Sequence, residues 1–138
     1  MGVETLAAGD ELVATVEDLR GDDMKLVAAL LQDPYPPHYD PRRAAELDYP
    51  GLLNQGPANL AYMLQPIVAE LDSPSHLVRF DTRYHDMVFE GETVTVVATV
   101  DEKRPDDDGG GQVTFSVELR KENGEVAVDG SVTAEFPT

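Results

Sequence analysis

The chain has 138 residues, enough for one domain with a buried core, and 41% of them are hydrophobic, which excludes an intrinsically disordered chain. Its 27 acidic residues against ten basic ones give a formal net charge of −17, which excludes the basic footprint that nucleic acid binding requires. Without cysteine the chain forms no disulfide, thiolate metal site or thiol nucleophile. It has no apolar run of about 18 residues to span a membrane and no signal-like start, so we expect a cytoplasmic protein without a membrane partner.

Residues 12–16 alternate apolar with small or polar side chains, which predicts a half-buried strand. The Gly-Asp-Asp sequence at 21–23 then offers an N-cap for a helix over residues 24–31. Pro34 disfavours helical geometry at Asp33, so that helix should end before it. The expected apolar face of the helix consists of Leu26, Val27, Leu30 and Leu31.

Asp33 and His38 lie five residues apart in a proline-rich segment, residues 32–44. Three prolines between them fix the backbone, so we expect a stiff, non-helical arch on which both side chains can face one small molecule. Asp40 as N-cap and Pro41 as first helical residue predict a second short helix directly after it. A carboxylate and an imidazole so placed suit acid–base chemistry, although the spacing alone also fits a loop in which both satisfy backbone groups.

The longest predicted helix runs over residues 56–71 and is apolar on much of its circumference, which predicts that it is the buried one. Pro66 lies inside it and should kink or split it. Strands are predicted over residues 77–87, 93–100, 113–119 and 126–136. The connections between them are a turn at Gly91 and Glu92, a polar loop over residues 102–111 and a hairpin turn at Asn123 and Gly124, with a bulge at Gly130. We therefore expect a four-strand meander, an antiparallel sheet wrapped around one buried helix.

Part of the proline-rich segment resembles the hydratase signature of the MaoC-like family, the (R)-specific enoyl-CoA hydratases and dehydratases. Asp33, Pro36, His38 and Ala44 occupy the signature positions, and Tyr35 stands where the family usually has Asn. Residues 49–57 resemble the family's glycine turn into its central helix, and residues 80–95 resemble its strand, turn and next strand. The resemblance implies an α+β hot-dog fold for the single domain 1–138.

The resemblance also implies that the protein adds water to a trans-2-enoyl-CoA thioester to give a 3-hydroxyacyl-CoA, or catalyses the reverse reaction. Asp33 and His38 would be catalytic, while Gly56 and Asn59 would contact the thioester oxygen. Coenzyme A enters as part of the substrate, and we expect no separate cofactor and no metal, because the three histidines lack metal-ligand spacing. A polyanionic carrier needs local cations, for which the candidates are Arg42, Arg43, Arg79 and Arg83. Family members pair their sheets, so we expect at least a homodimer.

Two other functions fit a hot-dog domain. A non-catalytic subunit that binds acyl-CoA or completes a heteromer is favoured by Tyr35 and by Gln32, which replaces a usual small residue. An acyl-CoA thioesterase would use Asn59 or Glu70, but it needs no arch that carries Asp33 and His38.

The acidic residues are spread along the chain, which predicts adaptation to concentrated salt. Ions screen charges over about 10 Å at 0.1 M but over about 3 Å at 1 M, and the folded state crowds its charges more than the unfolded chain does. The thermal midpoint, followed by circular dichroism at neutral pH, should therefore rise steeply between about 0.1 and 1 M KCl. Acidification toward pH 5 should partly replace salt. A midpoint that stays flat or falls with added KCl would contradict the halophilic interpretation.

Overall fold

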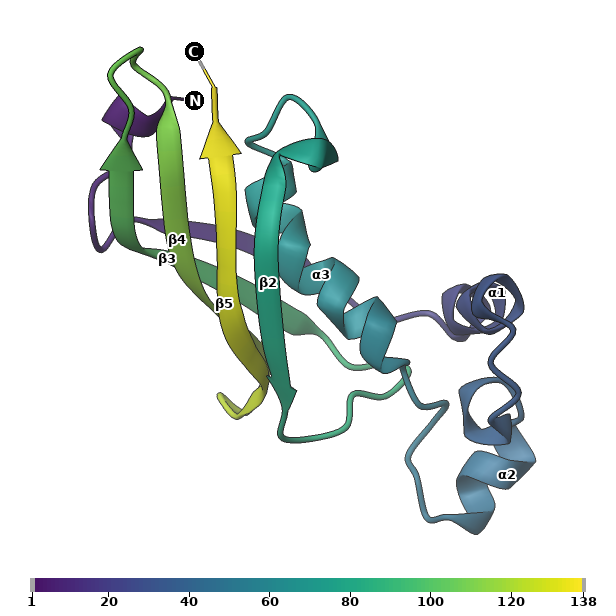
Figure 1. Ribbon diagram of the computed structural model, residues 1–138. Coiled ribbons are helices and arrows are strands. Elements are labelled where there is room, and N and C mark those ends of the chain that lie inside the picture. Colours follow the sequence, from purple (N-terminus) through teal and green to yellow (C-terminus); the bar gives the residue numbers. More distant parts are fainter. Residues whose placement is uncertain (1, 138) are drawn as a thin grey trace.

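Five antiparallel strands form one sheet in the order β1-β3-β4-β5-β2 in the computed structural model, which describes residues 2–137 (Figure 1). The predicted four-strand meander is wrong, because only the last three strands pair in sequence order and β2 crosses to the far edge to pair with β5. The predicted turn at Gly91 is present, since the Glu92 N–H donates to the Phe89 carbonyl at 3.1 Å, but it does not join two neighbouring strands. It belongs to a longer connection in which Val88 and Phe89 are buried and Phe89 forms a bridge with Leu53. The strands are β1 (Glu11–Val16), β2 (Leu77–Tyr84), β3 (Val94–Pro105), β4 (Gly111–Lys121) and β5 (Val126–Phe136).

One helix lies against the sheet, and two shorter helices stand beside it (Figure 1). The helix on the sheet is α3 (Gly56–Val68), which continues through Pro66 and ends three residues before the predicted boundary. The other two, α1 (Gly21–Leu31) and α2 (Pro41–Glu46), form with the turn between them the α1–α2 lobe. Single 3-10 turns lie at η1 (Val3–Thr5), η2 (Pro36–His38) and η3 (Pro74–His76). None of the helices in residues 2–137 has the length and apolar content that crossing a bilayer requires.

Alternation along the strands divides the sheet into a buried and a bare face. In β4, Phe115 and Leu119 are fully buried, and they belong to one core cluster with Met63 and Ile67 of α3. Burial of one such side chain contributes roughly 1.5–3 kcal/mol, so this shared core fixes α3 on the sheet. The other face carries hydroxyl and charged side chains, including a hydrogen-bonded pair, Thr114 and Thr133.

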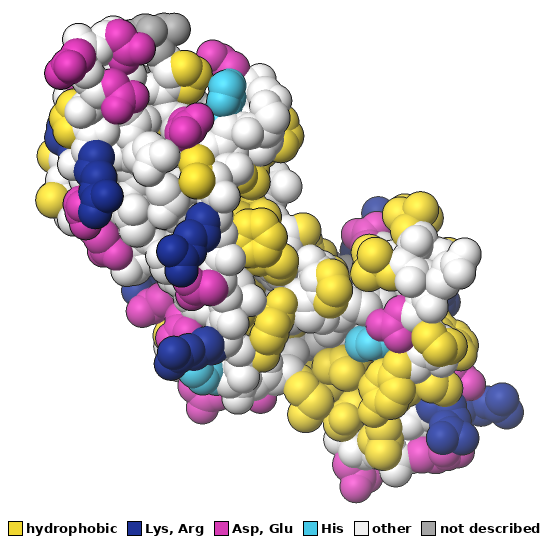
Figure 2. Space-filling view, in the orientation of Figure 1, with side chains coloured by type: hydrophobic (Ala, Val, Ile, Leu, Met, Phe, Trp, Pro, Cys, Tyr) yellow, Lys and Arg dark blue, Asp and Glu magenta, His cyan; other side chains and the backbone are white. Residues whose placement is uncertain are grey.

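The helix α1 buries a different face from the predicted one. It begins at Gly21 and turns Gly21, Met24 and Ala28 inward, whereas Leu30 is 73% exposed. Leu26 and Leu31 are also exposed. On the core-facing side, Gly21 lies close to the Glu90 and Leu52 side chains, and Met24 is fully buried. The predicted leucine face therefore lies on the surface, and apolar side chains gather over the lobe in Figure 2.

The strands differ from the predicted ones at three places. Gly130 is not a bulge: it pairs in register with Val117 and Thr82, and a side chain there would collide with the Asp81 carbonyl. The polar stretch 102–111 is a loop only over residues 106–110, since β3 extends to Pro105 after a bulge beyond Val100 and β4 begins at Gly111. The strand predicted over 77–87 ends earlier, at its residue 84.

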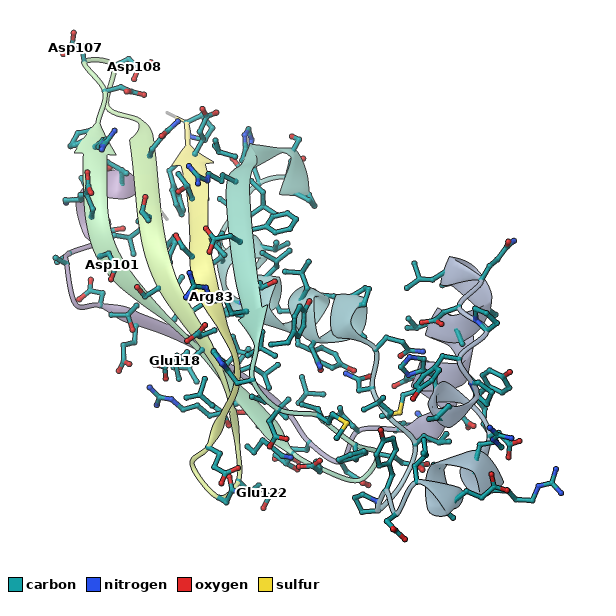
Figure 3. All side chains as sticks on the ribbon, turned by 60° about the horizontal axis from the view of Figure 1, so that its bottom comes forward. Arg83, Asp101, Asp107, Asp108, Glu118 and Glu122 are labelled. Carbon is teal, nitrogen blue, oxygen red and sulfur yellow. The ribbon has the colours of Figure 1, made fainter. Side chains whose placement is uncertain are left out.

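The acidic side chains reach both ends and the bare face of the sheet (Figure 3). Asp107 and Asp108 lie at the tip of the β3–β4 loop, and Glu122 lies in the turn between β4 and β5. Asp101 and Glu118 lie on the strands between these ends. The charge is therefore spread over the surface rather than gathered in one patch.

Candidate active site

The arch that carries Asp33 and His38 starts where α1 stops. Gln32 adopts a left-handed conformation, with φ 52°, and the Asp33 N–H still donates to the Ala28 carbonyl at 2.9 Å. One oxygen of the Asp33 side chain, Oδ1, accepts the Tyr35 N–H at 3.2 Å. The prediction of a fully non-helical arch is wrong for its second half, because the His38 N–H donates to the Tyr35 carbonyl and closes a 3-10 turn. Two prolines open that turn, where their missing N–H groups cost no hydrogen bond.

Leu53, which precedes α3, holds the arch through two hydrogen bonds. The Leu53 N–H donates to the Pro37 carbonyl at 2.9 Å, and His38 Nδ1 lies 2.7 Å from the Leu53 carbonyl oxygen. A carbonyl oxygen only accepts, so Nδ1 carries a hydrogen and Nε2 is the bare nitrogen of the neutral ring. Nε2 lies 3.4 Å from Asp33 Oδ2. The structure thus brings the two predicted residues together, with His38 buried and the Asp33 side chain one third exposed.

Tyr35 stands in the arch beside the imidazole. Its ring meets the His38 ring edge-on, with centroids 5.3 Å apart, and 45% of the residue is exposed. The Tyr35 hydroxyl also lies close to that of Tyr49. Partial burial raises the pKa of the Tyr49 hydroxyl, and the Tyr35 phenol raises it further. The Tyr35 ring therefore forms one side of the His38 environment. The backbone N–H of Tyr35, rather than its side chain, contacts Asp33.

The start of α3 supplies backbone donors and a buried set of amides. Within residues 2–137, the N–H groups of Gly56 and Ala58 meet no protein acceptor, as expected for the first turn of a helix. The Asn59 side chain is buried, and its Oδ1 accepts from Asn54 Nδ2 at 2.6 Å. Gln55, also buried, donates from Nε2 to the Met24 carbonyl at 2.9 Å and ties α1 to α3. The predicted contact residues Gly56 and Asn59 therefore offer different groups: Gly56 presents a free backbone N–H, and Asn59 has its Oδ1 engaged and its Nδ2 as the remaining donor.

Tyr84 belongs to this region but was not singled out from the sequence. Its hydroxyl donates to the Gly56 carbonyl at 2.9 Å, and its ring lies against Gly56, so the last residue of β2 fixes the first residue of α3. Phe80 and Tyr84 share one face of the strand by alternation, which was a usable signal. The sequence did not reveal that β2 runs beside α3. Without that topology, the alternation could not predict that Tyr84 contacts Gly56.

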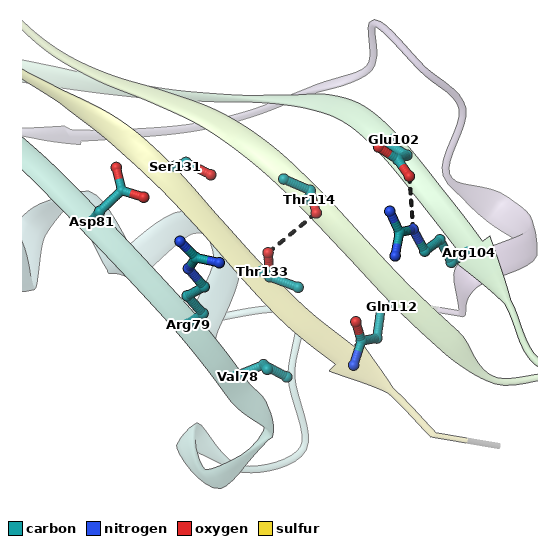
Figure 4. Close-up of a pocket in the computed structure, with 9 residues that line it drawn as sticks. All are labelled: Val78, Arg79, Asp81, Glu102, Arg104, Gln112, Thr114, Ser131 and Thr133. Carbon is teal, nitrogen blue, oxygen red and sulfur yellow. Dashed lines mark hydrogen bonds and ion pairs between the residues drawn. The ribbon is translucent and has the colours of Figure 1, made fainter.

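The four arginines proposed for coenzyme A are not brought together. Arg42 and Arg43 lie on α2 and pair with Asp40 at 3.9 Å and Glu46 at 3.4 Å. Arg79 and Arg83 lie on the bare face of β2, across the sheet from α3. Figure 4 shows Arg79 in a groove of about 460 Å³ on that face. Among residues 2–137, no three His, Asp or Glu side chains lie close enough together to hold a metal ion.

Comparison with known proteins gives one family. A model described as "MaoC like domain" matches residues 7–123. The R-hydratase PhaJ1 from Pseudomonas aeruginosa is 23% identical with a TM-score of 0.87, over 99% of this chain and 85% of that one. The (R)-hydratase of A. caviae involved in PHA biosynthesis is 21% identical with a TM-score of 0.84, over 97% of this chain and 99% of that one.

A third similar structure is the ChsH1–ChsH2 complex from Mycobacterium tuberculosis, at 16% identity and a TM-score of 0.76, over 95% of this chain and 98% of that one. No curated protein matches this sequence. At these identities the solved structures establish the hot-dog fold, and the family model covers most of the chain. The protein belongs to the MaoC-like dehydratase family.

Proposed function

We propose that this protein is a hydro-lyase that adds water to a trans-2-enoyl-CoA thioester, giving a 3-hydroxyacyl-CoA, or removes water in the reverse direction. The observation that carries the proposal is the pair of acceptors, Asp33 Oδ2 and His38 Nε2, 3.4 Å apart on one clamped arch. Membership of a dehydratase family and the similarity to two (R)-hydratases support the same reaction class.

A carboxylate oxygen and an imidazole nitrogen without hydrogen can each accept a hydrogen bond from one of the two O–H groups of the same water. The water oxygen then attacks C3 of the enoyl group, and its proton moves to one member of the pair as the C–O bond forms. A proton passes from the pair to C2 on the same face, so the substrate gains one hydrogen and one hydroxyl group and the pair returns to its starting state. The hydrogen bond from Nδ1 to Leu53 keeps the ring turned for this exchange.

The thioester oxygen gathers negative charge in the enolate-like transition state. The free N–H groups at the start of α3, at Gly56 and Ala58, are the proposed donors, because a helix N-terminus combines unpaired N–H groups with a partial positive charge. Tyr84 fixes the Gly56 backbone from the side. Asn59 is a further proposed donor through its Nδ2, because its Oδ1 already accepts a hydrogen bond from Asn54 and this bond fixes the orientation of the amide.

Coenzyme A is proposed as the carrier, bound as part of the substrate without a separate cofactor. Arg42 and Arg43 are the proposed phosphate contacts, because they extend from the same lobe as Asp33 and are exposed. Arg79 and Arg83 lie across the sheet from the arch and do not fit this role within one chain.

A second candidate function is a non-catalytic acyl-CoA-binding subunit of a heteromer. Tyr35 in place of the family Asn is the observation that favours it, and the similar ChsH1–ChsH2 structure is described as a complex. A thioesterase is less well supported, because Asn59 is engaged by Asn54 and Glu70 lies beyond the end of α3.

Removal of either member of the pair should abolish hydration. Asp33→Asn and His38→Gln keep the shape of each side chain but change its proton chemistry, so kcat should fall at least about 100-fold. The assay is the loss of enoyl absorbance over a panel of enoyl-CoA substrates in molar KCl, with thiol release followed in parallel. Asp40→Asn is the matched control, because Asn also caps α2, and it should keep its activity. Retained hydration in either site variant would contradict the proposed roles.

Tyr35→Asn tests the family difference directly. The backbone bond to Asp33 and the Leu53 contact to His38 do not depend on the Tyr35 side chain, so hydration should change by no more than about tenfold, or about 1.4 kcal/mol. Circular dichroism should show an unchanged fold. An inert wild type that gains activity on this substitution would instead support the non-catalytic subunit.

The edge of the sheet predicts assembly into at least a homodimer. β2 is an edge strand, and it exposes Val78, Phe80 and Tyr84, each at close to half of its surface. An unpaired strand edge with apolar side chains is a site for pairing with another chain. Light scattering in molar KCl should give at least twice the monomer mass, and Phe80→Lys should lower it. A monomeric wild type would contradict the proposal.

A further inference from the structure

Most of the ten basic side chains are neutralised within the chain. Six pair with carboxylates within 4.0 Å, and Lys103 donates to two backbone carbonyls. In residues 2–137 the remaining three, Lys25, Arg79 and Arg83, have no carboxylate within that distance. A basic side chain that forms no ion pair is unexpected in a chain with 27 acidic residues. The six paired residues are Arg20, Arg42, Arg43, Arg104, Arg120 and Lys121.

Lys25 differs from the two arginines because it lines the groove that reaches the proposed active site. This groove has a volume of about 410 Å³ and lies between α1 and the arch. Asp33, the only acidic residue in its lining, is the carboxylate that faces His38. The groove is lined by Lys25, Ala28, Ala29, Gln32, Asp33, Pro34 and Tyr39.

The helical wall of the groove has a simple sequence basis. Three of its residues, Lys25, Ala28 and Ala29, stand at positions i, i+3 and i+4 of α1 and form one stripe on the helix, and Gln32 follows directly after the helix ends. Ala28 and Ala29 have short side chains, so the surface is recessed between the longer side chains of Lys25 and Gln32. Pro34 and Tyr39 supply the opposite, largely apolar wall. The result is an open, largely apolar surface groove with Lys25 toward one end and Asp33 at the other.

The two ends are separated by about two helical turns, or about 10 Å along α1. A thioester whose reacting carbons lie at Asp33 and His38, and which extends along this groove, brings a group several bonds away close to Lys25. The walls between them suit methylene groups, and the ammonium suits a negative charge.

We propose that Lys25 binds an anionic group of the thioester substrate, with the intervening part of the substrate in the groove between α1 and the arch. This inference rests on the proposed hydration of a thioester. The negative group has two possible sources with the same chemistry, a carboxylate at the far end of the acyl chain or a phosphate of the carrier. In this role Lys25 sets specificity and takes no part in proton transfer.

The test compares wild type with Lys25→Met, which keeps the stem and removes the charge, and Lys25→Arg, which keeps the charge. Four substrates are used at one fixed KCl concentration: plain and carboxylate-terminated enoyl chains, each on coenzyme A and on N-acetylcysteamine, which carries no phosphate. Lys25→Met should raise KM at least about fivefold, with kcat changed less than about twofold, on the substrates that carry the recognised anion. Lys25→Arg should restore KM.

The pattern across substrates identifies the source of the charge. A KM effect on both coenzyme A substrates alone assigns a carrier phosphate, and an effect on both carboxylate-terminated substrates alone assigns the acyl carboxylate. An equal effect on all four substrates, or none, overturns the proposal. Arg120→Met is the matched control, because it removes one positive charge from the bare face of the sheet and should leave every KM unchanged.

Calorimetric binding of the saturated thioesters separates this inference from the proposed function. A wild type that hydrates its substrate, with Lys25→Met indistinguishable from it, overturns the role of Lys25 alone. A wild type that binds saturated thioesters through Lys25 but hydrates nothing overturns the enzymatic proposal and leaves the anion contact standing. A wild type that neither hydrates nor binds overturns both.

Discussion

The hydrogen bond between His38 Nδ1 and the Leu53 carbonyl is the contact on which the candidate site depends. It joins two segments 15 residues apart, fixes which imidazole nitrogen carries hydrogen, and brings the arch to the start of α3. The reciprocal bond from the Leu53 N–H to Pro37 makes this a two-point clamp. Because Asp33 and His38 lie on the same short arch, their separation is set locally, and only their position relative to α3 needs the clamp.

The rest of the fold supports the other side of that clamp. The core between α3 and the sheet fixes the helix, while β2 adds Tyr84 against Gly56 and the Val88 carbonyl accepts the Asn54 N–H. The segment before α3 is therefore held from the sheet and from the arch at once. The crossing of β2 to the far edge of the sheet makes this possible, since a simple hairpin with β3 would have placed Tyr84 elsewhere.

Local rules predicted much of the molecule, and the errors came from contacts distant in sequence. Proline and Asp40 located the start of α2, and the alternation of β4 and β5 identified their buried faces. The meeting of Asp33 and His38 followed from their spacing and from the family resemblance. Helical periodicity gave the wrong face for α1, because the buried face is set by contacts with distant residues: Gly21 lies close to the Glu90 and Leu52 side chains, and Gln55 donates to the Met24 carbonyl. Gly130 was misread for a similar reason: its lack of a side chain serves the approach of β2, which no local pattern reveals.

Gln55 shows that the junction of α1 and α3 is not built for greatest stability. Its Oε1 is buried and accepts no hydrogen bond from the described residues, although its Nε2 holds the Met24 carbonyl. A buried acceptor left without a donor costs about 1–3 kcal/mol. Because Gln55 joins α1 to the start of α3, this cost lowers the stability of the contact between the α1–α2 lobe and the rest of the fold. Substitutions at this position could therefore stabilise the contact. A protein engineered for a more rigid lobe would start at this residue.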